Sequence, residues 1–255
     1  MKFARFAVNG TVKYGIVDGD QLREIRGDLF GDHTPTGTVY RLDAVKLLTP
    51  CVPSKILALG LNYALHVQES KRPMPKQPEP FFKVPSSLCH PGDPIVIPAG
   101  AGETHYEGEL VVVIGKTAKR VSPEEALDYV FGYTCGNDVS VRPWQRGDLQ
   151  WWRAKSSDTF APLGPWIETE IPDPSRLTLE TRLNGQVKQH TTTDQLLFNV
   201  PTTISFISQV VTLYPGDCIY TGTPEGVGPM DDGDTVEIEI SGIGVLRNPV
   251  VREKE

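Results

Sequence analysis

Two carboxylates stand two residues apart at the start of an apolar run, in the segment Glu107-Gly108-Glu109. Successive side chains of a strand point to opposite faces, so acids at this spacing leave from one face and can reach the same cation. Acids two apart can also form the solvated face of a strand, as the strict alternation at residues 236–240 indicates. The run after Glu109 is apolar on both faces and predicts a buried strand, where a carboxylate must be neutralised or bind a metal. Both interpretations stay open at this point.

A third acid, Asp138, follows another predicted strand. Asn-Asp pairs are common in turns, which is the alternative interpretation of this position. If Asp138 joins Glu107 and Glu109, the three carboxylates favour a hard octahedral ion, Mg²⁺ or Mn²⁺, with positions left for water and substrate. The four cysteines lie far apart with no C-x-x-C pair, so we interpret them as reduced core thiols rather than zinc ligands.

His66 and Glu69 are a second pair that could do chemistry. They are three residues apart, so on a short helix they share a face and can contact each other. A histidine backed by a carboxylate is a good general base for activating water, because imidazole titrates near neutral pH. The alternative is a solvated helix that carries one histidine. Regular helix cannot continue far, because four prolines follow, at positions 73, 75, 78 and 80.

The elements that must position these residues are mostly strands. Residues 2–25 alternate short strand-like runs with turn signals and predict a small antiparallel meander. Residues 27–42 are polar and include Gly31, Pro35 and Gly37, which predicts a linker. We therefore expect a small N-terminal β domain over residues 1–50 and a catalytic domain over residues 51–255.

Further strands are predicted in the larger domain, at residues 56–60, 81–84, 95–97, 109–115, 130–135, 165–169, 177–183, 218–221, 236–240 and 245–250. Asn184-Gly185 is typical of a hairpin turn. Two helices have recognisable starts: a capping box begins at Ser122, and Pro201 opens a run that reaches Leu213. The fold class is therefore mixed α/β and strand-rich.

Composition excludes several classes of function. The 255 residues carry a net charge of −7, and the basic residues are scattered, so no basic stripe is available for nucleic acid. Neither a signal peptide nor a run of about 20 apolar residues is present, which predicts a cytoplasmic protein that does not insert into a membrane. The glycine-rich stretch 222–228 lacks the lysine of a phosphate-binding loop.

Several longer motifs carry a resemblance to a known family. They are Gly60-Leu61-Asn62-Tyr63, Phe81-Phe82-Lys83, His105-Tyr106-Glu107-Gly108-Glu109-Leu110, Gly132-Tyr133-Thr134-Cys135-Gly136-Asn137-Asp138, Ala154-Lys155-Ser156-Ser157-Asp158, Leu183-Asn184-Gly185 and Thr221-Gly222-Thr223-Pro224-Glu225-Gly226-Val227-Gly228. From about Lys55 to near the C-terminus, the chain closely resembles the fumarylacetoacetate hydrolase family, with the motifs in the same order.

The resemblance implies a mixed β roll with flanking helices, usually assembled as a homodimer. It also implies that Glu107, Glu109 and Asp138 hold Mg²⁺ or Mn²⁺, and that the substrate is a small 2-oxo acid or 1,3-diketone that chelates the ion. Lys155 would add positive charge where negative charge develops during the reaction. Without the resemblance, the neighbouring sequence favours a surface lysine at this position.

The resemblance also assigns residues around the substrate. His66 and Glu69 match a lid that orders over the substrate in family members that cleave or decarboxylate 2-oxo acids. Arg142 and Gln145 resemble substrate-facing polar residues of the smaller members. Thr223 looks like a donor to the substrate carboxylate or keto oxygen, in a loop that is also a tight glycine-rich turn. His105 precedes the acidic motif, and we assign it no catalytic role.

Three reactions fit such a site: hydrolysis of an acylpyruvate, decarboxylation of an oxaloacetate-like diacid, and isomerisation of 2-hydroxyhepta-2,4-diene-1,7-dioate in aromatic catabolism. The His66 and Glu69 pair favours the first two, because isomerisation needs no activated water. We therefore expect a metal-dependent carbon–carbon hydrolase with decarboxylase capability, with the isomerase as the alternative. A non-catalytic metal-binding scaffold would be expected to lack Lys155, the lid pair or a carboxylate.

Overall fold

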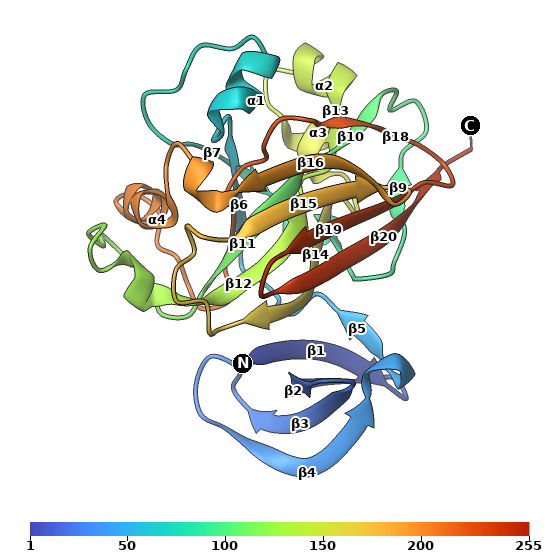
Figure 1. Ribbon diagram of the computed structural model, residues 1–255, viewed down its shortest axis with the longest axis vertical. Helices are drawn as coiled ribbons and strands as arrows, with labels where there is room; N and C mark the ends of the chain where they lie inside the picture. The colour runs from blue at the N-terminus through green and yellow to red at the C-terminus, as the bar shows by residue number, and fades with distance from the viewer. Residues whose placement is uncertain (255) are drawn as a thin grey trace.

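The computed structural model describes residues 1–254, and within this range the largest sheet has twelve strands. Most of them follow one path of neighbours, in the order β4 (His33–Arg41), β3 (Gln21–Gly27), β2 (Thr11–Asp18), β1 (Lys2–Val8), β14 (Ala161–Glu168), β12 (Val130–Asn137), β11 (Gly108–Ile114), β17 (Cys218–Tyr220), β6 (Ile56–Gly60) and β7 (Glu79–Lys83). Two short strands join its side, β5 (Lys46–Leu48) on β1 and β8 (Leu88–Cys89) on β14. The antiparallel pair β1–β14 links the N-terminal strands to the main body (Figure 1).

Two smaller sheets complete the strand framework. One has the order β16 (Gln186–Thr192), β15 (Thr178–Leu183), β19 (Thr235–Ile240), β20 (Gly244–Arg252) and β9 (Ile95–Ile97). The other has the order β13 (Ser140–Val141), β10 (Thr104–Tyr106) and β18 (Gly228–Met230). The five-stranded sheet lies across β11, β12 and β14 in Figure 1 and contacts them. The expected strand-rich mixed α/β fold is confirmed.

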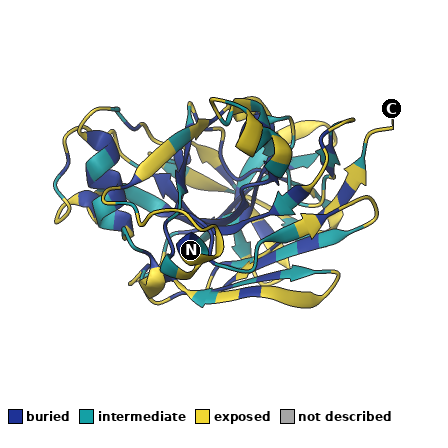
Figure 2. Ribbon diagram, turned by 90° about the horizontal axis from the view of Figure 1, so that it is seen from above, coloured by how far each residue is buried: buried dark blue, intermediate teal, exposed yellow. Residues whose placement is uncertain are grey.

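Strand β11 is the centre of the core. Leu110, Val112 and Ile114 face one hydrophobic cluster, and Val111 and Val113 face another on the opposite side. Every residue of β11 is buried, and Figure 2 shows the buried strands in the interior of the molecule. Each such side chain contributes about 1.5–3 kcal/mol on burial. The prediction of a strand buried on both faces is confirmed, and the acidic motif lies at its start.

The helices are short. They are α1 (Ala64–Glu69), α2 (Arg142–Gly147), α3 (Trp152–Ser156) and α4 (Val200–Ser208), with 3₁₀ turns η1 (Leu42–Ala44), η2 (Pro85–Ser87), η3 (Ala126–Tyr129) and η4 (Thr193–Gln195). Asn199 caps α4, because its side chain accepts a hydrogen bond of 3.0 Å from the Thr202 backbone N–H. None of the helices between residues 1 and 254 is long and apolar enough to cross a membrane.

Two sequence predictions of helix extent are wrong. The expected capping box at Ser122 does not form, because the Ser122 hydroxyl donates to Glu125 Oε2 at 3.1 Å instead of accepting from a backbone N–H. Only turns and the 3₁₀ turn η3 follow. Strand β12 then begins at Val130. Helix α4 stops at Ser208, because the chain turns there and Leu213 pairs with Ala118 in an isolated bridge.

The predicted linker at residues 27–42 is also wrong, because most of it is strand β4, paired with β3. Gly37 has a φ of 84° near a register irregularity between the two strands. Strand β4 is the edge strand next to β3, so its polar residues can face solvent. Pro35 is tolerated there, because the outer side of an edge strand pairs with no further strand of the sheet. The Asn184-Gly185 hairpin turn is confirmed, since both residues have positive φ between β15 and β16.

Candidate active site

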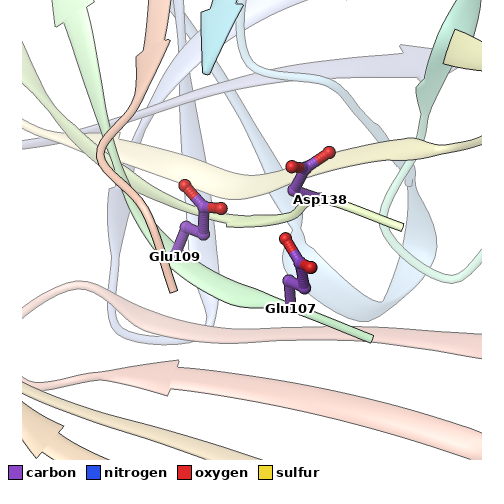
Figure 3. Close-up of side chains that lie close together, drawn as sticks. All are labelled: Glu107, Glu109 and Asp138. Carbon is purple, nitrogen blue, oxygen red and sulfur yellow. The ribbon is translucent and has the colours of Figure 1, made fainter. Parts of the chain in front are cut away.

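Three buried carboxylates meet beneath one end of β11. Each of Glu107, Glu109 and Asp138 offers one oxygen, and these oxygens all lie within 4.8 Å of one another. Figure 3 shows the three side chains converging on a common point. Their exposed fractions are 5%, 0% and 1%. Solvent therefore contributes little to neutralising them, and the protein or a bound cation must do so.

Backbone hydrogen bonds fix this arrangement. Gly108 on β11 stands opposite Asn137 on β12, so the ends of the two strands lie side by side. The Glu107 N–H donates to the Asn137 side-chain oxygen at 2.9 Å, and the Asp138 N–H donates to the Glu107 carbonyl at 2.9 Å. Glu109 follows Glu107 by two residues and points the same way (Figure 3). Strand pairing thus brings together acids that are about thirty residues apart in the sequence.

The electrostatic surroundings of the carboxylates differ. Burial disfavours the charged form of Glu107, but Lys155 and Arg142 outweigh this effect and hold the pKa of Glu107 below its usual value. Burial also acts on Glu109, and there the negative charges of Asp138 and Glu107 add to it and raise the pKa of Glu109 well above its usual value. Glu109 is therefore the carboxylate that the protein leaves least compensated.

Two buried lysines contact the carboxylates. Lys155 Nζ lies 2.8 Å from Glu107 Oε2 and 2.6 Å from Asp138 Oδ2, and Lys83 Nζ lies 2.6 Å from Asp138 Oδ1. Burial opposes the charge of Lys155, but Asp138 and Glu107 outweigh it and raise the pKa of Lys155. For Lys83 burial prevails, and the nearby charge of Lys155 adds to it, so the pKa of Lys83 is lowered.

Sequence reasoning assigned no role to Lys83, although it noted the Phe81-Phe82-Lys83 motif. The lysine ends β7, whose burial otherwise alternates between exposed and half-buried, so nothing local marks it as buried. Its Nζ also donates to the Lys155 carbonyl, which joins β7 to α3. The one available signal was the motif itself.

The donor set fits a hard divalent ion. It consists of carboxylate oxygens only, and Glu109 Oε1 is buried without a hydrogen-bond partner among residues 1–254. The other Glu109 oxygen accepts from the Gly222 N–H, which orients the carboxylate. An oxygen ligand set of this kind suits Mg²⁺ or Mn²⁺.

A cavity of about 460 Å³ opens beside Glu107, which lines it, whereas Glu109 and Asp138 are not among its lining residues. It contains most of the residues that the sequence singled out, and its lining includes His66, Glu69, Glu107, Arg142, Gln145, Lys155 and Thr223. His105 also lines it, with its Nε2 atom 2.6 Å from Glu103 Oε1. Burial lowers the pKa of His105, and Arg142 adds to this effect. The tertiary structure thus gathers seven of the nine candidate residues around one space, with Glu109 and Asp138 next to Glu107.

The His66 and Glu69 pair stands at this cavity. His66 Nδ1 lies 3.1 Å from Glu69 Oε2, and the other Glu69 oxygen accepts from the Gly226 N–H at 3.2 Å. Helix α1 is held by Asn62, a buried side chain that donates to the Thr221 carbonyl at 2.7 Å and accepts from the Phe198 N–H at 2.8 Å. These contacts fix the helix so that His66 faces the cavity.

The three candidate substrate-binding residues are engaged with the protein to different degrees. Arg142 lies 2.7 Å from Glu107 Oε1 and donates to Gln145 at 2.8 Å. The Thr223 hydroxyl donates to the Gly108 carbonyl at 3.0 Å and accepts from Gln189 at 2.9 Å. Its one proton is therefore already used within the protein. Gln189, which sequence reasoning missed, carries no local signal on its largely exposed strand.

Comparison with known proteins identifies the family. Residues 55–251 match the model described as fumarylacetoacetate (FAA) hydrolase C-terminal, and residues 1–50 match a model described as Rv2993c-like, N-terminal. The chain belongs to the fumarylacetoacetate hydrolase family. The resemblance seen in the sequence motifs is confirmed.

Several solved structures of fumarylacetoacetate hydrolase family members superpose over the whole chain. A 5-carboxymethyl-2-hydroxymuconate delta-isomerase from Mycobacterium smegmatis is 46% identical, with a TM-score of 0.93 and coverage of 99% of this chain and 100% of that one. A 2-hydroxyhepta-2,4-diene-1,7-dioate isomerase from Mycobacterium marinum is 44% identical, with the same TM-score and full coverage of both. Maleylpyruvate hydrolase from Sphingobium sp. SYK-6, in complex with manganese(II) and pyruvate, is 35% identical, with a TM-score of 0.85 and full coverage of both.

Proposed function

We propose that this fumarylacetoacetate hydrolase family member is a divalent-metal-dependent hydrolase and decarboxylase of small 2-oxo acids, acting on acylpyruvates and oxaloacetate-like diacids. The observation that carries the proposal is the His66–Glu69 contact of 3.1 Å at the edge of the cavity. A pair of this kind can take a proton from water, which carbon–carbon hydrolysis requires.

The metal site belongs to the same proposal. Glu107, Glu109 and Asp138 would hold Mg²⁺ or Mn²⁺, and the bound ion would polarise the keto group of a chelating 2-oxo acid. The manganese(II) and pyruvate in the maleylpyruvate hydrolase structure support this choice of ion and ligand class.

Charge balance around the carboxylates favours an anionic ligand. Three cations, Lys83, Lys155 and Arg142, contact Glu107 and Asp138 and equal the three acids in number, although none of them contacts Glu109. A divalent ion would leave an excess of two positive charges in a buried site. A 2-oxo acid whose keto oxygen gains negative charge during the reaction would offset that excess.

The residues of the chain have separate roles in the proposed reaction. His66, held by Glu69, would remove a proton from water on the open side of the cavity. Lys155 would stabilise negative charge that develops on the substrate, since its Nζ already lies between Glu107 and Asp138. Arg142 and Gln145 would orient the substrate carboxylate. Glu69 would keep the imidazole in position through its second contact with Gly226.

A second candidate function is isomerisation of 2-hydroxyhepta-2,4-diene-1,7-dioate. The observation in its favour is that the two solved relatives at 46% and 44% identity are both described as isomerases. In that reaction His66 would shuttle a proton along the substrate, without activating water.

The test compares three substrates on protein stripped by a chelator and then given Mg²⁺ or Mn²⁺. Acetylpyruvate, oxaloacetate and 2-hydroxyhepta-2,4-diene-1,7-dioate are assayed with the wild type and a His66→Ala variant. We expect metal-restored cleavage or decarboxylation, and a loss of about 10²- to 10⁴-fold in kcat in the variant. Turnover of the dienoate alone, unchanged by the substitution, would contradict the hydrolase proposal and support the isomerase.

We also propose that the protein forms a homodimer. The family resemblance implies this assembly, and several large apolar side chains are exposed on or beside the contacting elements β7 and α3, namely Phe82, Val84, Leu149 and Trp152. Sedimentation velocity measures the mass directly. A monomeric species at micromolar concentration would contradict the proposal.

A further inference from the structure

The cavity beside Glu107 continues outward beyond the reactive residues. A second cavity of about 580 Å³ shares Gly60, Leu61, Arg72 and Trp151 with the first and extends along the proline-rich loop after α1. The two spaces therefore meet at a common wall. A substrate bound at the carboxylates has room to extend toward this junction.

The cations along this path fall into two groups. Arg142 and Lys155, near the carboxylates, are both paired with Glu107. Arg72 and Arg146 also line the first cavity, but their side chains form neither an ion pair nor a hydrogen bond with any residue from 1 to 254. In a protein with 32 acidic and 25 basic residues, two arginines at one cavity without an acidic partner among residues 1–254 call for an explanation.

The surroundings of these arginines are suited to an elongated anion. Trp151 and Leu61 line both cavities and supply apolar surface where the two adjoin. Trp151 is held in place, since its ring packs edge-on against Phe81 with centroids 5.3 Å apart. An apolar surface with cations beside it matches a chain that carries a charged group at its far end.

We propose that Arg72 and Arg146 bind a second carboxylate at the far end of the substrate, so that the site selects dicarboxylic 2-oxo acids over monocarboxylic ones of equal length. This inference rests on the proposed function for the reactive end of the site. Guanidinium groups suit the task, because they present several donors in a plane that matches a carboxylate. Both side chains are exposed, so each contact contributes modestly.

The test is a calorimetric titration of Mn²⁺-loaded protein with matched ligand pairs. 2-Oxoadipate is compared with 2-oxohexanoate, and 2-oxopimelate with 2-oxoheptanoate, so that each pair differs only in the terminal carboxylate. We expect the diacid of at least one pair to bind about tenfold more tightly. Arg72→Met and Arg146→Met should each weaken diacid binding by about three- to tenfold and leave monoacid binding unchanged.

The matched control is Arg176→Met, which removes the same charge from an exposed site outside both cavities. It should leave the diacid preference intact. Equal binding of diacid and monoacid by the wild type, or a preference that survives in both cavity variants, would overturn the inference. Failure of the proposed function is distinguishable, because it would appear as absent turnover while the diacid preference in binding persists.

Discussion

Replacing Lys83 by methionine tests how the buried charges are balanced. The Lys83 side chain is fully buried, and its Nζ lies 2.6 Å from Asp138, which is 1% exposed. Breaking a buried ion pair by removing one partner costs about 3–5 kcal/mol, because the remaining charge is left without compensation. Asp138 keeps its contact with Lys155 at 2.6 Å, so we expect a value of about 3 kcal/mol for the metal-free protein.

The assay is thermal unfolding with and without Mn²⁺. A loss of about 3 kcal/mol corresponds to a fall in Tm of about 6–12 °C for a domain of this size. Added Mn²⁺ should raise the Tm of Lys83→Met more than that of the wild type, because the ion replaces the lost positive charge beside Asp138. Calorimetric titration should accordingly show tighter Mn²⁺ binding by the variant.

Lys55→Met is the matched control. Lys55 also pairs with a fully buried carboxylate, that of Asp217. However, Asp217 accepts further hydrogen bonds from the Ser54 hydroxyl at 2.7 Å and the Tyr214 N–H at 2.7 Å. We expect a loss of about 1 kcal/mol that does not respond to Mn²⁺. The reasoning is refuted if metal-free Lys83→Met is as stable as the metal-free wild type. It is also refuted if Mn²⁺ raises the Tm of Lys83→Met and of the wild type equally.

Two further predictions concern the same region. Because burial and the charges of Asp138 and Glu107 raise the pKa of Glu109, the metal-free wild type should lose stability as pH rises above 4.5, the usual pKa of a glutamate. Glu109→Gln lacks this carboxyl and should not show that loss. In denaturant unfolding, the free energy of unfolding of the variant relative to that of the wild type should therefore increase with pH. A Cβ at Gly136 would lie 2.4 Å from Tyr220 Cε1 and 2.5 Å from Val111 Cγ2. Gly136→Ala should therefore lower stability by about 1–3 kcal/mol or more, measured by urea unfolding.

Controls separate these effects from general disturbance. The Glu109 prediction fails if wild type and Glu109→Gln show parallel pH profiles without metal. The carboxyl of Glu107, whose pKa is lowered, does not interfere, because its stabilising effect is lost only at more acidic pH. For the glycine, Gly147→Ala is the comparison, since a Cβ there meets nothing within 4 Å and should change stability by less than about 0.5 kcal/mol.

Local patterns were sufficient for much of the fold. Strand β11 was predictable because its run of apolar residues is too continuous for a half-exposed strand, and the Asn184-Gly185 turn was predictable because its φ values suit these residues. Strand β4 was not predictable, because an edge strand exposes its residues and tolerates the polar, proline-containing sequence of a linker. The helix expected after Ser122 is absent, because the Ser122 and Glu125 side chains bond to each other and cap no backbone N–H.

By itself, the sequence determined the acidic motif of Glu107 and Glu109, the His66 and Glu69 spacing and the family. These depend on alternation along a strand, on helix periodicity and on motifs read in order, all of which are local. Only the tertiary structure decided that Lys83 is buried against Asp138, 55 residues away. It also decided that Arg72 and Arg146 line one cavity with no acidic partner in the described part of the chain, residues 1–254. The charge environment of a side chain depends on residues distant in sequence, so the electrostatics of the site emerged only when the strands paired.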